Sequence, residues 1–199
     1  MTVLALSDTG VTLIVIAVAV LLPLIWFIAT YNVLVRLRQH CRESWSGIDT
    51  ELKRRYDLIP NLVATVQGYA KHEREVLERV IEARSRAAAS HGSPAQQAQD
   101  ENMLVQSLRG LFALAENYPD LKASENFLHL QRELANTEDR IQAARRFYNA
   151  NVRDLNTRIE VFPSNLIAGA FSFRPEEFFE VEDSRVRAAP ALSLGGQAS

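Results

Sequence analysis

Several residue types that mark other protein classes are scarce or scattered in this chain of 199 residues. A single cysteine cannot form an intramolecular disulfide. The 8 glycines are dispersed, and no glycine-rich loop of the nucleotide-binding kind is present. No stretch alternates apolar and polar residues as a half-buried β-strand does. An excess of positive charge is also absent, because 24 Asp and Glu balance 22 Lys and Arg, which argues against a nucleic-acid partner.

The average composition, with 47% apolar and 23% charged residues, fits one soluble domain, but it hides a long uncharged stretch. No charged side chain occurs from Thr9 to Val35, and the apolar core of this stretch is Val11 to Tyr31. About 20 apolar residues at 1.5 Å rise span the roughly 30 Å hydrocarbon layer of a bilayer. The sequence therefore predicts a transmembrane helix at residues 10–35, with the lipid bilayer as its partner, after a short external tail at residues 1–9.

A cleaved signal peptide is the alternative to an anchor. It requires a basic N-terminal region, a shorter apolar stretch and a small-x-small cleavage site. The first eight residues contain no Lys or Arg, so we favour an uncleaved anchor. Arg36, Arg38 and Arg42 follow the apolar stretch, and the positive-inside rule places them in the cytoplasm. The expected location is the bacterial inner membrane, in a single pass, with the N-terminus outside and the remainder of the chain in the cytoplasm.

Beyond the membrane segment, apolar residues recur at the three- and four-residue spacing of amphipathic helices. Prolines and a turn cluster at residues 90–94 interrupt the pattern. The sequence predicts an all-α fold with helices at about 31–58, 60–90, 95–118 and 124–162. An antiparallel up-and-down four-helix bundle over residues 36–180 buries their apolar stripes most simply, and a dimeric coiled coil is the alternative. Residues 181–199 are predicted to be a flexible tail.

Two blocks of sequence resemble the bacterial LemA family. They are Arg54 to Val63, which reads RRYDLIPNLV, and Glu116 to Ala123, which reads ENYPDLKA. The similarity extends over roughly residues 10–180. The resemblance implies one membrane pass near the N-terminus followed by a cytoplasmic antiparallel helical bundle. The family brings no established enzymatic activity, cofactor or catalytic residue.

The densest charge cluster is a candidate surface for docking a partner protein. An upright helix places its first residue, Lys53, about 27 Å beyond Val35, farther from the lipid headgroups than the Debye length of about 8 Å. We therefore expect a docking surface at the distal tip, and the alternative is a solvated or ion-paired helix end. The candidate docking residues are Lys53, Arg54, Arg55, Asp57, Asn61 and Tyr118.

Four phenylalanines after Pro163 form a second candidate site, which the bundle topology predicts to be membrane-proximal. They are Phe171, Phe173, Phe178 and Phe179. In one interpretation they pack back onto the end of the last helix. In the other they insert into the bilayer interface or dock a neighbouring membrane protein.

Polar residues elsewhere do not form a recognisable metal or catalytic motif. The Glu-x-x-His pairs of di-iron bundles are absent, because Tyr69 precedes His72 and Asn126 precedes His129 at that spacing. Cys41 occupies an apolar seam and is interpreted as a small buried hydrophobe, with palmitoylation as an alternative. We expect no metal and no cofactor. Asn156, inside the last helix, is interpreted as a hydrogen-bonding group that fixes register between helices.

These observations predict a non-enzymatic scaffold or adaptor that contacts a membrane or cytoplasmic protein. A self-associating or membrane-shaping scaffold, and hence a homo-oligomer, is the first alternative. An enzyme with a cryptic site is the second, and it requires buried groups with perturbed pKa values in the helical seams.

Overall fold

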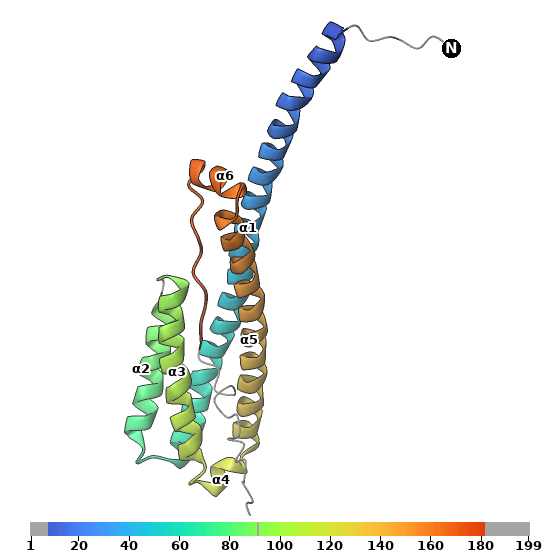
Figure 1. Ribbon diagram of the computed structural model, residues 1–199. Helices are drawn as coiled ribbons and strands as arrows, with labels where there is room; N and C mark the ends of the chain where they lie inside the picture. Colours follow the sequence, from blue (N-terminus) through green and yellow to red (C-terminus); the bar gives the residue numbers. More distant parts are fainter. Residues whose placement is uncertain (1–7, 91, 182–199) are drawn as a thin grey trace, which may run out of the picture. The chain divides into compact units, whose positions relative to one another are not determined.

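The computed structural model describes residues 8–90 and 92–181, and all regular structure in these residues is helical. This confirms the all-α fold class. The tails expected at 1–9 and 181–199 lie almost wholly outside the described residues. The helices, drawn in Figure 1, are α1 (Asp8–Tyr69), α2 (Arg74–Ala89), α3 (Pro94–Ala115), α4 (Pro119–Lys122), α5 (Glu125–Glu160) and α6 (Ser164–Ala170).

The chain divides into two compact units, and the long helices α1 and α5 contribute to both. Unit 1 comprises Met1–Arg55 and Glu133–Phe178. Unit 2 comprises Tyr56–Arg132 and Phe179–Ser199. Each unit is described by itself below.

Unit 1 begins with the apolar part of α1, which is long enough and apolar enough to cross a membrane. Its side chains are exposed, as at Leu13 (67%) and Leu22 (62%). Thr30 is the first buried side chain in the part of α1 whose exposure is described. Figure 1 shows α5 running alongside this part of α1. The buried seam of α1 is Thr30, Leu34, Cys41, Ile48 and Leu52, and that of α5 is Leu134, Ile141, Tyr148, Val152 and Leu155.

Unit 2 contains the last turns of α1, the α2–α3 hairpin, α4 and the first turns of α5. Helix α3 starts as its sequence predicts, because Ser93 caps it by accepting from the Gln96 backbone N–H (3.5 Å) and Pro94 occupies the first turn. The core side chains include Ile59, Leu62, Val66, Val80, Leu104, Leu111 and Leu121, which are all fully buried.

The largest departure from the predicted helices is at Pro60, where the sequence analysis ends one helix and begins another. Helix α1 continues through Pro60 to Tyr69, and the chain turns only at residues 70–73. Proline lacks the N–H that would bond to the carbonyl of Tyr56, four residues earlier. Arg84 of α2 supplies a donor instead, since its Nε lies 3.0 Å from that carbonyl oxygen. A tertiary hydrogen bond thus offsets part of the local cost of a proline inside a helix.

Helices α3 and α5 begin and end close to the predicted bounds of 95–118 and 124–162. The short helices α4 and α6 were not expected. Each begins at or just after a proline, Pro119 for α4 and Pro163 for α6, because proline favours the first turn of a new helix.

Candidate functional site

The basic part of the expected docking surface lies in unit 1 and is ion-paired. Lys53 Nζ is 2.7 Å from Asp49, and Arg54 is 3.1 Å from Glu133. The side chain of Arg55 is only 2% exposed, and its Nη1 is 2.8 Å from Glu138 of α5. Arg55 is therefore not a surface residue, and including it in the docking surface was wrong. Its side chain points toward α5, where the Glu138 carboxylate offsets part of the cost of burying a cation.

The other three expected docking residues lie in unit 2. Asp57 and Asn61 are exposed, and Tyr118 is half-buried. The Tyr118 hydroxyl donates to Glu73 at 3.4 Å. Partial desolvation and the Glu73 carboxylate raise the pKa of this hydroxyl above its ordinary value. Tyr118 therefore links the loop before α4 to the turn before α2.

A buried polar cluster in unit 2 was missed by the sequence analysis. The Tyr56 hydroxyl donates to the carboxylate of Glu101, which is fully buried. Gln97 Nε2 donates to the same carboxylate (3.0 Å) and to the Ala87 carbonyl (3.1 Å). This cluster ties α1 to the end of α2 and to α3. A signal was present, because extending the apolar seam of α3 toward its N-terminus at three- and four-residue steps reaches Glu101 and then Gln97.

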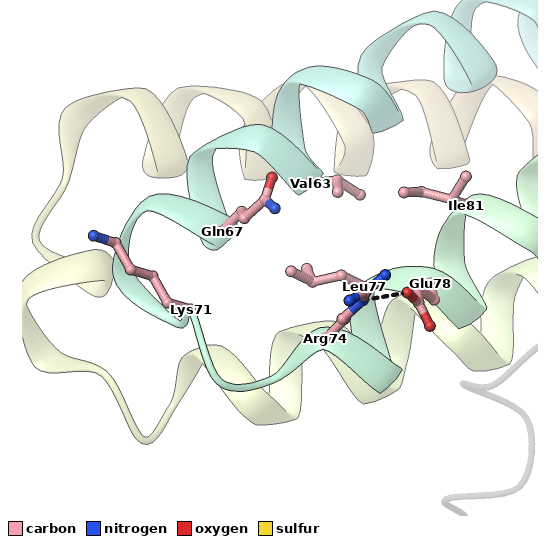
Figure 2. Close-up of a pocket in the computed structure, with 7 residues that line it drawn as sticks. All are labelled: Val63, Gln67, Lys71, Arg74, Leu77, Glu78 and Ile81. Carbon is pink, nitrogen blue, oxygen red and sulfur yellow. Dashed lines mark hydrogen bonds and ion pairs between the residues drawn. The ribbon is translucent and has the colours of Figure 1, made fainter.

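Unit 2 also has an open hollow of about 350 Å³ between the end of α1 and α2 (Figure 2). Two nearly buried side chains, Val63 and Leu77, give it an apolar floor, and Ile81 is 49% exposed. The remaining lining residues are polar and are Gln67, Lys71, Arg74 and Glu78. Figure 2 shows Lys71 at the end opposite Ile81, and Arg74 Nε bonded to Glu78 at 2.6 Å.

The phenylalanine segment is divided between packing and exposure. The Phe171 ring is 4.9 Å from Tyr31 and 5.8 Å from Phe27 of α1, yet 47% of its side chain is exposed. Phe173 is buried, with its ring 6.0 Å from Tyr31 and 4.8 Å from the Arg38 guanidinium carbon. In unit 2, Phe179 is fully buried. Phe178 is half-buried in unit 1. Phe173 thus packs against α1 and not, in the contacts described, against the end of the last helix, whereas Phe171 keeps an exposed apolar face.

The chain after α6 is held against α5 by hydrogen bonds. Asn156 bonds to both backbone groups of Glu176, each at 2.9 Å. The Tyr148 hydroxyl donates to the Glu177 carbonyl at 2.9 Å. Asn156 thus bonds to this extended segment and not to another helix, which corrects its expected role.

Charge and burial around this segment also affect Cys41. Burial, followed by the nearby carboxylates of Glu176 and Asp154, raises the pKa of the Cys41 thiol to about 11. The thiol is therefore protonated at neutral pH. Its burial at 2% exposure agrees with the interpretation of Cys41 as a small core residue. Across the described residues, no group of three or more His, Cys, Asp or Glu side chains is arranged to hold a metal ion.

One apolar helical stretch of membrane-spanning length, followed by a helical body, defines a class of helical proteins with a candidate N-terminal anchor. The LemA family model matches residues 44–193, and the chain belongs to the LemA family. The match starts after the apolar stretch, so it rests on the helical body.

Curated relatives agree with this assignment. Protein LemA of Metamycoplasma hominis is 29% identical over 146 residues, covering 71% of this chain and 65% of the relative. Magnetosome protein MamQ 2 of Paramagnetospirillum magneticum is 26% identical over 188 residues, covering 80% of this chain and 69% of the relative. Magnetosome protein MamQ of Magnetospirillum gryphiswaldense is 24% identical over 187 residues, covering 79% of this chain and 69% of the relative. The chain spans about two-thirds of the length of these relatives.

Proposed function

We propose that this chain is a membrane-anchored adaptor that binds a partner protein on the cytoplasmic side. The anchor is the apolar part of α1, in a single pass, and Arg36, Arg38 and Arg42 support a cytoplasmic position for the helical body. We further propose that the helices beyond the anchor form the antiparallel four-helix bundle expected from their apolar stripes.

The observation that carries the adaptor proposal is the hollow between α1 and α2. An apolar floor surrounded by polar side chains is the usual composition of a protein–protein contact. Two helices flank the hollow, which favours a partner helix that inserts apolar anchors between them. Glu78 pairs with Arg74, whereas Lys71 lies at the end of the hollow where the turn joins α1 to α2. We therefore propose an amphipathic helix with an acidic residue facing Lys71 as the ligand.

Self-association is the second candidate function, and Phe147 on α5 is the observation that favours it. This large apolar side chain is 64% exposed in unit 1. An isologous contact through Phe147 would pair two copies of the chain.

An enzyme with a cryptic site would be expected to use the buried Tyr56, Gln97 and Glu101 cluster. These three side chains hydrogen-bond to one another, and we propose a structural role for them. The adaptor remains the better-supported proposal, because the hollow offers a surface that a partner can reach.

Photo-crosslinking in cells tests the adaptor proposal. A photoreactive amino acid is placed at Ile81 in the hollow, and the control position is Leu128, which is 41% exposed in the same unit. We expect one reproducible adduct from position 81, absent from position 128, and lost when Lys71→Glu reverses the charge. An adduct insensitive to Lys71→Glu, or none at position 81, contradicts the proposal. An adduct of the chain with itself supports self-association instead.

A further inference from the structure

The turn after α5, the short helix α6 and the residue after it carry large apolar side chains that protein does not cover. Val161 is 48% exposed, Phe162 73%, Leu166 63% and Phe171 47%. In the same region Ser164, Ile167 and Ala168 are buried, so α6 packs one side against the protein and leaves Leu166 outside. We call the exposed set Val161, Phe162, Leu166 and Phe171 the apolar foot.

The apolar foot lies beside the part of α1 that leaves the apolar stretch. Phe171 contacts the rings of Phe27 and Tyr31, and all of these residues belong to unit 1. Figure 1 shows α6 next to α1 at this level. Thr30 is the first residue of α1 that is buried by the rest of the protein. The helical body therefore first covers α1 within one turn of Phe27 and Tyr31.

The length of the apolar stretch indicates how deep in the bilayer the apolar foot lies. A hydrocarbon layer of about 30 Å accommodates about 20 helical residues. Counted from Val11, where the apolar core begins, that length ends near Thr30. The first charged residue is Arg36, a further six residues or about 9 Å along the helix. The apolar foot is thus level with the boundary between acyl chains and headgroups.

We propose that the apolar foot is a second membrane contact, which inserts its side chains into the lipid interface beside the anchor. This inference rests on the anchor part of the proposed function and is independent of the docking hollow. Lipid is the favoured occupant because Phe171, the member of the apolar foot that contacts α1, joins Phe27 at the end of the apolar stretch. Apolar side chains at this depth are stabilised when they move from water into the boundary between headgroups and acyl chains, as in interfacial helices. The contact would fix the tilt of the helical body against the bilayer.

Depth-dependent fluorescence quenching of the full-length chain in phosphatidylcholine vesicles tests the proposal. Single cysteines are introduced by Leu166→Cys, Phe147→Cys and Leu22→Cys and labelled with the environment-sensitive fluorophore NBD. Exposure at Leu166 (63%), Phe147 (64%) and Leu22 (62%) is matched. The native Cys41 is 2% exposed with a thiol pKa of about 11, so it is not labelled under native conditions.

Phosphatidylcholine with a nitroxide on its acyl chain should quench NBD at positions 22 and 166 several-fold more than NBD at position 147. Quenching at 22 without quenching at 166 overturns the apolar foot and leaves the anchor intact. No quenching at 22 overturns the anchor itself. Protection of position 166 from water-soluble quencher without quenching by the lipid indicates a second copy as the occupant, and this also overturns the proposal. Phe162→Cys repeats the measurement if Leu166→Cys does not fold, as judged by circular dichroism.

Discussion

The hydrogen bond from Arg84 to the Tyr56 carbonyl should be coupled energetically to Pro60. In the native chain Pro60 offers no N–H, and Arg84 Nε donates to this carbonyl at 3.0 Å. A hydrogen bond from a charged group contributes about 1.5–3 kcal/mol, and removing the donor leaves a partly buried carbonyl less well satisfied. Arg84→Met should therefore lower the free energy of unfolding by about 2 kcal/mol.

The same Arg84→Met substitution is then measured in a Pro60→Ala background. Alanine restores the backbone N–H, so the Tyr56 carbonyl regains its intrahelical donor. Arg84→Met in the Pro60→Ala background should then cost less than about 1 kcal/mol, which gives a coupling energy of about 1–2 kcal/mol. The assay is denaturant unfolding of the full-length chain in detergent micelles, followed by far-ultraviolet circular dichroism.

Arg86 provides the matched control for this cycle. It also lies on α2, but its guanidinium pairs with Asp100 of α3 at 3.0 Å. Arg86→Met should cost the same free energy in both backgrounds. If Arg84→Met also costs the same with proline and with alanine at position 60, then Arg84 does not compensate for the proline, and the explanation for the continuous α1 is refuted.

Three further predictions follow from the described side chains. Arg55→Met should lower the unfolding free energy by about 3 kcal/mol because it leaves Glu138 without its buried partner. Lys53→Met removes an exposed ion pair and should lower it by at most about 1 kcal/mol. Equal losses for the two variants in chemical denaturation would show that Arg55 is solvated. Tyr56→Phe removes a donor to the buried Glu101 and should cost about 1–3 kcal/mol, and no change in the unfolding midpoint would argue against the cluster. The pKa of the Cys41 thiol is about 11 in the folded chain instead of 9.0, so the folded chain keeps this proton at a pH where the unfolded chain loses it. The free energy of unfolding relative to that of Cys41→Ala should therefore be constant below about pH 9 and fall toward pH 11. A difference between the two proteins that stays flat from pH 8 to pH 11 would contradict this.

Much of the helical architecture could be predicted because it follows from local periodicity and length. The uncharged stretch from Thr9 to Val35 indicates the long apolar part of α1, and three- and four-residue spacing locates α3 and α5. The continuous α1 could not be predicted, because its passage through Pro60 depends on Arg84 from another helix. A local rule that ends helices at proline was correct at Pro119 and Pro163, where no such donor is described.

The candidate site was less predictable, because exposure depends on tertiary partners. Lys53, Arg54 and Arg55 are adjacent in sequence and all cationic, yet only the Arg55 side chain is buried. Burial depends on how the side chain packs against α5, which the local sequence does not reveal. Likewise, Asn156 sits within a helix, but its partner is an extended backbone twenty residues later. The hollow next to Lys71 arises from a turn at residues 70–73, whereas the rule that ends a helix at proline places this turn at Pro60.

The central claim, a helical body held on the cytoplasmic side of a membrane by the apolar part of α1, is tested most directly by protease protection. Cells expressing the full-length chain with a C-terminal epitope are converted to spheroplasts, and the alkali-washed membranes are also collected. The account predicts that the epitope remains with the washed membranes, survives external protease in intact spheroplasts and is lost on lysis. Release of the chain into the alkaline supernatant, or digestion of the epitope in intact spheroplasts, would contradict it.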